Sequence, residues 1–215
     1  LEPNAFELIS KNFNKEDWTK VIIEDATIND LDEEAIKKAR IEFVKRNPKY
    51  SEEIESWDNA KFLNKAILTI RGKITRACFI LLGKQEEEHF LDSAVKIRWN
   101  LKTIDNQDKD FEIFHIPFIL SVDEVYKKIR NLKYRYLKEG TLFPDEVLRY
   151  DPFVIREPLN NAIAHQDYSE KSRINVIEFE DDHLVFTNYG RFIPKSVEDV
   201  VLHDSPEENY RNPFL

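Results

Sequence analysis

The chain of 215 residues contains no methionine, one cysteine and four glycines. A single cysteine excludes a disulfide within the chain. Cys78 lies in the apolar run "ACFILLG", so we expect it to be buried and inert rather than nucleophilic. The scarcity of glycine and the absence of low-complexity tracts exclude long flexible linkers and a glycine-rich phosphate loop.

Long apolar runs are also absent. No stretch approaches the roughly 18 apolar residues that cross a bilayer, and the first residues, "LEPNAFELIS", lack the basic-then-apolar order of a signal peptide. These absences predict a cytoplasmic protein with no membrane partner. Because the chain lacks methionine and starts at Leu1, we expect it to be a piece of a longer protein.

The charge is unevenly distributed. Acidic residues outnumber basic ones 41 to 32, and residues 151–215 hold 13 acidic and 6 basic side chains. This segment should repel a phosphate backbone, so any DNA-binding surface of the longer protein is expected outside this chain. The five histidines show no spacing typical of a zinc site.

The first part of the chain is predicted to be helical. Residues 29–47 have apolar positions at helical spacing and a cap at Asn29 or Asp30. Two further helices are expected over 58–70 and 74–83, the second closed by Gly83. We interpret residues 1–83 as mainly helical.

Residues 84–215 mix both periodicities, which predicts an α+β layered sandwich with mostly antiparallel pairing. The expected elements, in chain order, are strands at 93–99 and 111–118, a helix at 121–137, an edge strand or loop at 141–152, a helix ending near 165, and a hairpin of 173–180 with 183–190. Within the 121–137 helix, "KYRYLK" interleaves bases with aromatics. We interpret it as a solvated helix end, with nucleic-acid contact as the alternative.

The segment "REPLNNAIAHQDY", residues 156–168, is the main candidate for a functional site. Pro158 suits the first turn of a helix, so we expect the helix to start between Asp151 and Arg156. Its apolar stripe, predicted to face the core, comprises Ile155, Leu159, Ala162 and Ile163.

A polar column lies nearly opposite that stripe. Glu157, Asn161 and His165 follow one another at i+4 spacing, so their side chains rise on one side of the helix. Carboxylate and amide oxygens suit Mg²⁺. From spacing alone, the alternative is a column that simply faces water. The ending His165, Asp167 and Tyr168 is interpreted as a network that closes the helix, without an assigned ligand.

The segments "REPLNNAIAHQDYS", "INVIEFEDDHLVFTNYGRFIP" and "NYRNPFL" together carry a resemblance. The chain resembles the divergent ATPase-like module of the GHKL superfamily, which includes gyrase, heat-shock protein ninety, histidine kinases and MutL. More closely, it resembles the C-terminal module of bacterial and archaeal putative transcriptional regulators that carry an N-terminal Schlafen/AlbA-type DNA-binding domain. The resemblance implies that residues 1–83 are the region linking the two domains, and that residues 84–215 form an incomplete GHKL, or Bergerat-like, domain that ends before a further glycine-rich segment.

The resemblance also implies roles for individual residues. Asn161 would hold the Mg²⁺ that bridges the phosphates of ATP, and Glu157 would be the catalytic base of an ATPase that is at most weak. His165 would lie at the cofactor site. Asn188 stands where the family has the aspartate that binds adenine, and Gly190 would allow the base to approach closely, or would be a plain turn glycine.

Two functions follow from these expectations. In the first, ATP with Mg²⁺ controls the conformation or homodimerisation of a transcriptional regulator that binds DNA through a domain outside this chain. In the second, the module is degenerate and serves as a dimerisation or interaction platform without nucleotide. The replacement of aspartate by Asn188 and the missing glycine-rich loop favour the second. A metal hydrolase ranks third.

Overall fold

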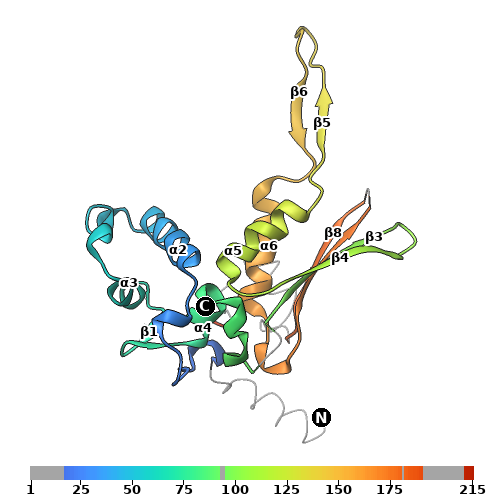
Figure 1. Cartoon of the computed structure of the whole chain (residues 1–215). Helices are drawn as coiled ribbons and strands as arrows, with labels where there is room; N and C mark the ends of the chain where they lie inside the picture. Colours follow the sequence, from blue (N-terminus) through green and yellow to red (C-terminus); the bar gives the residue numbers. More distant parts are fainter. Residues whose placement is uncertain (1–16, 93–94, 181, 191–210) are drawn as a thin grey trace, which may run out of the picture.

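The structure is a computed structural model that describes residues 17–92, 95–180, 182–190 and 211–215. Its centre is a four-stranded sheet of order β4-β3-β7-β8, with α5 and α6 beside it (Figure 1). The α+β class expected from the sequence is confirmed. Among the described residues, no helix combines the length and apolar character needed to cross a membrane.

The sheet consists of two antiparallel hairpins, and one strand of each hairpin pairs in parallel with a strand of the other. β3 pairs antiparallel with β4, β7 pairs antiparallel with β8, and β3 and β7 run parallel. The bounds are Ile97–Lys102 for β3, Asp108–Phe114 for β4, Ile174–Phe179 for β7 and Leu184–Thr187 for β8. The predicted hairpin of 173–180 with 183–190 is confirmed.

The first predicted hairpin lies at shifted positions. The polar segment 100–110 was expected to be a loop, but both strands extend into it and leave a short turn around Asn106, whose φ is 62°. The reason is that β4 is an edge strand with most of its side chains exposed, so polar residues are accepted there.

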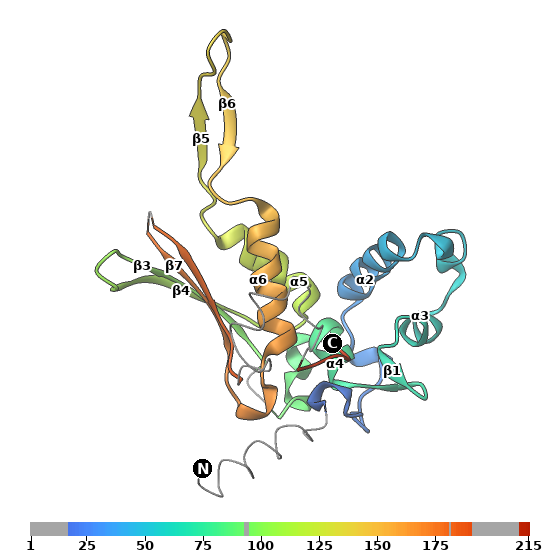
Figure 2. The same cartoon turned by 180° about the vertical axis from the view of Figure 1, so that it is seen from behind.

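Two helices pack on the sheet and are linked by an arm. α5 spans Phe118–Lys128 and α6 spans Pro152–His165, and between them β5, Lys133–Tyr136, pairs with β6, Asp145–Leu148. This hairpin projects away from the sheet and helices (Figures 1 and 2).

Two predictions for this part of the chain are wrong. The helix expected over 121–137 ends at Lys128, and "KYRYLK" belongs to a strand and the residues after it rather than to a helix end. Helical spacing misled because the run Val125, Ile129, Leu132 continues the apolar period past the end of α5. The backbone of Ile129 is already extended, with φ −64° and ψ 126°.

The N-terminal part is mainly helical, as expected. Its elements, in order, are η1 Trp18–Lys20, η2 Ile28–Asp30, α2 Glu33–Arg46, η3 Pro48–Tyr50, η4 Ile54–Ser56, α3 Asn59–Lys65, β1 Thr69–Ile70, β2 Lys73–Ile74, α4 Arg76–Leu82 and η5 Gln85–Phe90. A further short helix, η6, Tyr168–Glu170, lies outside this part and follows α6. The cap of α2 is Asp32 rather than Asn29 or Asp30, because Asp32 accepts a hydrogen bond from the amide of Ala35 at 2.8 Å. The helix expected over 58–70 stops at Lys65, and its last residues pair with β2.

One continuous core joins the helical part to the sheet. Cys78 is fully buried within it, as expected, and burial raises the pKa of its thiol to about 12. On the sheet, Trp99 is buried and donates a 3.0 Å hydrogen bond to Glu178 of β7, which also accepts from Arg130 at 2.9 Å. This set of contacts ties the chain after α5 to the sheet below it.

Candidate functional site

The candidate site is carried by α6. Asp151 caps the helix through a 2.8 Å hydrogen bond from the amide of Phe153, and Pro152 occupies the first turn. The predicted apolar stripe is confirmed, since Ile155, Leu159, Ala162 and Ile163 are all buried. Pro158, expected in the first turn, lies inside the helix instead, where its missing N–H leaves one helical hydrogen bond unmade.

Glu157 and Asn161 are neighbours on the outward side of α6. The side-chain amide of Asn161 lies 3.4 Å from Oε1 of Glu157, and Glu157 is exposed while Asn161 is half-buried. The pair offers a carboxylate and an amide oxygen to a cation. Among the described residues, no group of three acidic, histidine or cysteine side chains could hold a metal alone. An ion here would need further oxygens from a ligand or from water.

His165 lies about two turns after Glu157. It is the last residue of α6. It is half-buried, and the pKa of its imidazole is lowered first by burial and second by the positive charge of Arg211. The neutral ring is therefore favoured near neutral pH.

The Asn188-Tyr189-Gly190 segment lies against this same end of α6. The amide of Tyr189 donates to Oε1 of Gln166 at 2.8 Å, and the amide of Asp167 donates to the carbonyl of Tyr189 at 2.7 Å. The side chain of Asn188 donates to the Tyr189 carbonyl at 3.2 Å. The segment after β8 is thus hydrogen-bonded to the residues that follow α6.

Gly190 makes room for an arginine. Its φ of 138° is a conformation that residues with side chains rarely adopt, and a Cβ added there would lie 2.9 Å from Nε of Arg211. The close approach that the sequence suggested for Gly190 is therefore made by a side chain of the same protein.

The "HQDY" ending closes the helix, as interpreted from the sequence. Gln166, Asp167 and Tyr168 are buried, and the hydroxyl of Tyr168 donates to the carbonyl of Ile163 at 3.0 Å. Asp167 lies 3.3 Å from Arg211. Burial raises the pKa of Tyr168, and its ring stacks on Trp18 with 5.6 Å between centroids. These residues join α6, the N-terminal part and the "RNP" segment.

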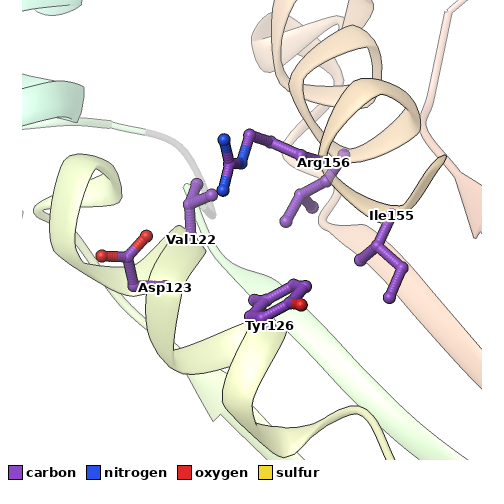
Figure 3. Close-up of a pocket in the computed structure, with 6 residues that line it drawn as sticks. Val122, Asp123, Tyr126, Ile155 and Arg156 are labelled. Atoms are coloured by element: carbon purple, nitrogen blue, oxygen red, sulfur yellow. The ribbon is translucent and has the colours of Figure 1, made fainter. Parts of the chain in front are cut away.

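A small cavity lies on the other side of α6. It has a volume of about 30 Å³ and is lined by Val122, Asp123 and Tyr126 of α5 and by Ile155, Arg156 and Leu159 of α6 (Figure 3). This volume suits about one water molecule and excludes a nucleotide. A second hollow, of about 170 Å³, lies between α2 and α3 beside Arg40. Neither is lined by any of the predicted site residues.

Sequence reasoning missed the partners of the helix end. Arg211 and Asn212 come from the "RNP" segment, which the sequence offered only as part of a resemblance. The side chain of Asn212 donates to the carbonyls of Ala164 and Gln166 at 3.0 and 2.8 Å. The hint in the sequence was an arginine and an asparagine followed by Pro213, a rigid segment suited to capping a helix that lacks a glycine cap.

Comparison with known proteins identifies related segments and a related fold. A family model described as a domain of unknown function (DUF8451) matches residues 7–97. No curated protein sequence matches the chain. Among solved structures, the DIP2311 protein from Corynebacterium diphtheriae superposes with a TM-score of 0.68 at 17% identity, over 93% of this chain and 38% of that one. This likeness shows a shared fold, and this chain spans well under half the length of that protein.

Proposed function

We propose that α6 and the end of β8 bind a nucleotide with Mg²⁺. One observation carries the proposal: Glu157 and Asn161 are paired on the outward side of α6, 3.4 Å apart, while the end of the same helix lies against Asn188 and Gly190. The helix, the antiparallel hairpin and the N-x-G turn follow one another in the order that the resemblance to GHKL proteins implies.

The two ends of the proposed site would serve different parts of the ligand. Glu157 lies eight residues before His165, a rise of about 12 Å along the helix. The phosphates would lie near Glu157 and Asn161, and the base would lie near Asn188. His165 would lie between the phosphates and the base. The amide oxygen of Asn161 would hold Mg²⁺, and the carboxylate of Glu157 would polarise a water molecule as general base.

In the intact protein, such a module would act as a regulatory element. We propose a GHKL-like sandwich whose nucleotide state sets the conformation of a cytoplasmic transcriptional regulator, with DNA contacts made outside this chain. The acidic character of residues 151–215 supports that division, because this part should repel DNA.

Calorimetric titration of Mg-ATP into the intact protein tests the proposal. The wild type should bind, and Asn161→Ala should weaken binding by on the order of 100-fold or more, because the metal ligand is lost. Asn160→Ala is a matched control: it removes an exposed amide one residue away that points elsewhere on the helix. Absence of binding by the intact wild type contradicts the proposal.

A second function is favoured by a specific observation. Asn188 and Gly190 already serve contacts within the protein, with Tyr189 and Arg211 respectively. A module that uses these positions to hold its own fold could act as an interaction platform without nucleotide. The same titration separates the two functions, since only the first predicts heat from Mg-ATP.

A further inference from the structure

The β5–β6 hairpin, together with the turn that joins its strands, forms an arm over residues 132–149. It stands clear of the sheet and helices (Figures 1 and 2). Of the 16 large hydrophobic residues that are exposed among the described residues, seven lie on this arm: Leu132, Tyr134, Tyr136, Leu137, Leu142, Phe143 and Val147. At the tip, Leu142 is 92% and Phe143 81% exposed. Exposed apolar surface concentrated in one place is typical of a contact site.

The two faces of the arm differ in character. Tyr134 pairs with Val147 across the strands, so both side chains lie on one face, and alternation puts Tyr136 on that face as well, opposite Asp145. Arg135 and Glu146 pair on the opposite face. One face of the hairpin is therefore mainly apolar, with the carboxylate of Asp145, ion-paired to Lys138, at its end toward the tip.

Three of the four cations of the arm are ion-paired within it. Arg135 lies 2.7 Å from Glu146, Lys133 lies 3.7 Å from the same carboxylate, and Lys138 lies 2.8 Å from Asp145. The hydrogen bond and charge of Arg135 lower the pKa of Glu146. Residues 132–149 hold four basic and three acidic side chains, whereas the chain as a whole has a net charge of −9. An arm with three of its four cations ion-paired is poorly suited to a polyanion such as DNA.

We infer that the arm pairs with the arm of a second copy of this chain, apolar face against apolar face. A two-stranded hairpin alone is marginally stable, so covering its apolar face is a gain for each copy. The seven exposed side chains present on the order of 800 Å² per copy, which matches one partner's share of a standard interface. A two-fold axis places the same patch opposite itself and leaves the face with the Arg135–Glu146 ion pair in water. Pairing through the arms would also keep the rest of the two chains, each with a net negative charge, apart from each other.

This inference goes beyond the nucleotide site and does not depend on it. Asn161→Ala leaves the arm intact, and substitutions on the arm leave α6 intact. A failure of nucleotide binding and a failure of pairing are therefore distinguishable.

Sedimentation velocity of the intact protein over the micromolar range tests the inference. The wild type should be a dimer. The double variant Tyr134→Glu, Val147→Lys replaces a cross-strand apolar pair with an ion pair, which keeps the hairpin but charges its apolar face. Its dissociation constant should rise by on the order of 100-fold. The control Ile104→Glu charges a residue that is 75% exposed on the turn between β3 and β4 and should leave the dimer unchanged.

Two further measurements complete the test. Val147→Cys should give a covalent dimer with a short bis-maleimide while the unsubstituted protein, with Cys78 buried, does not react. Added salt should not weaken the dimer, because apolar contacts hold it. A monomeric wild type, a dimer that survives the double variant, or salt-sensitive DNA binding by a monomer through Lys133 and Arg135 would each overturn the inference.

Discussion

The side-chain amide of Asn212 donates a hydrogen bond of 2.8 Å to the main-chain carbonyl of Gln166, just after the last residue of α6. The same amide donates to the carbonyl of Ala164 at 3.0 Å, and Asn212 is 3% exposed. A helix end has carbonyls without partners within the helix, and here a segment 46 residues later supplies the donors. The "RNP" segment is thus a cap for the helix that carries the candidate site.

Removing this cap should destabilise the fold. Asn212→Ala leaves the buried carbonyl of Gln166 without its side-chain donor, so we expect the free energy of unfolding to fall by about 1–2 kcal/mol. Urea denaturation followed by circular dichroism measures the change. Asn175→Ala, which loses two exposed hydrogen bonds, to Thr187 at 3.2 Å and from Arg173 at 3.3 Å, is the control and should change the free energy by less than about 0.5 kcal/mol. Equal losses in the two variants would contradict the capping role.

Gly190→Ala should also destabilise the protein, for a different reason. The new Cβ would need a backbone conformation at φ 138° and would lie 2.9 Å from Arg211. We expect a loss of about 2–3 kcal/mol. Gly72→Ala is a matched control, because Gly72 has a positive φ of 77° but no heavy atom within 4 Å of its added Cβ. It should lose about 1 kcal/mol. If the two losses are the same, Arg211 does not require the glycine.

Glu178 is a second position where loss of a buried polar contact is expected to lower the stability of the protein. Glu178→Ala would leave the indole N–H of Trp99 without its acceptor and Arg130 with only its 3.4 Å contact to Glu180, at a cost of about 3 kcal/mol. The variant should also alter Trp99 fluorescence, since the ring loses its hydrogen bond. Glu124→Ala removes an exposed carboxylate paired with Lys127 and should leave the denaturation midpoint in place. A Glu178→Ala protein as stable as the Glu124→Ala protein would show that the contact is dispensable.

The sequence predicted α6 and the β7–β8 hairpin well because each shows one periodicity over a sufficient length. The stripe from Ile155 to Ile163 has helical spacing, and buried and half-buried positions alternate along β7, Ile174–Phe179. It failed at 133–148, where Tyr134 and Tyr136 lie within a run that also fits a helix. Whether such a run forms an arm depends on where α5 ends, and the chain just after that end makes a long-range contact, the 2.9 Å ion pair of Arg130 with Glu178.

The candidate site could be predicted only in part. The i+4 spacing of Glu157 and Asn161 follows from helix geometry, so their proximity could be foreseen. The placement of the segment from Asn188 to Gly190 could not, because it rests on the hydrogen bond from Tyr189 to Gln166, 23 positions away, and on the close approach of Arg211 to Gly190. Local patterns carry no information about such pairings.

The last prediction concerns pH and the end of α6. The pKa of His165 is lowered from its ordinary value of 6.5, because burial disfavours the charged ring and Arg211 repels it. In the unfolded chain the ring regains its ordinary pKa. Between the two values the unfolded state binds more protons, so stability rises with pH in that window. The contribution of the neutral ring is therefore fully present above about pH 6.5 and is lost as pH falls through the folded pKa.

Two measurements check this sign. NMR titration of the imidazole should place the folded pKa of His165 below 6.5, and Arg211→Gln should move it upward because the repelling charge is gone. Urea denaturation from neutral pH down to about pH 5 should show a steeper loss of stability in the wild type than in His165→Gln, whose side chain does not titrate. A His165 that titrates at or above 6.5, or identical pH slopes for the two proteins, would mean that the ring gains a proton as easily folded as unfolded. In that case the surroundings of His165 at the end of α6 would not disfavour the charged imidazole.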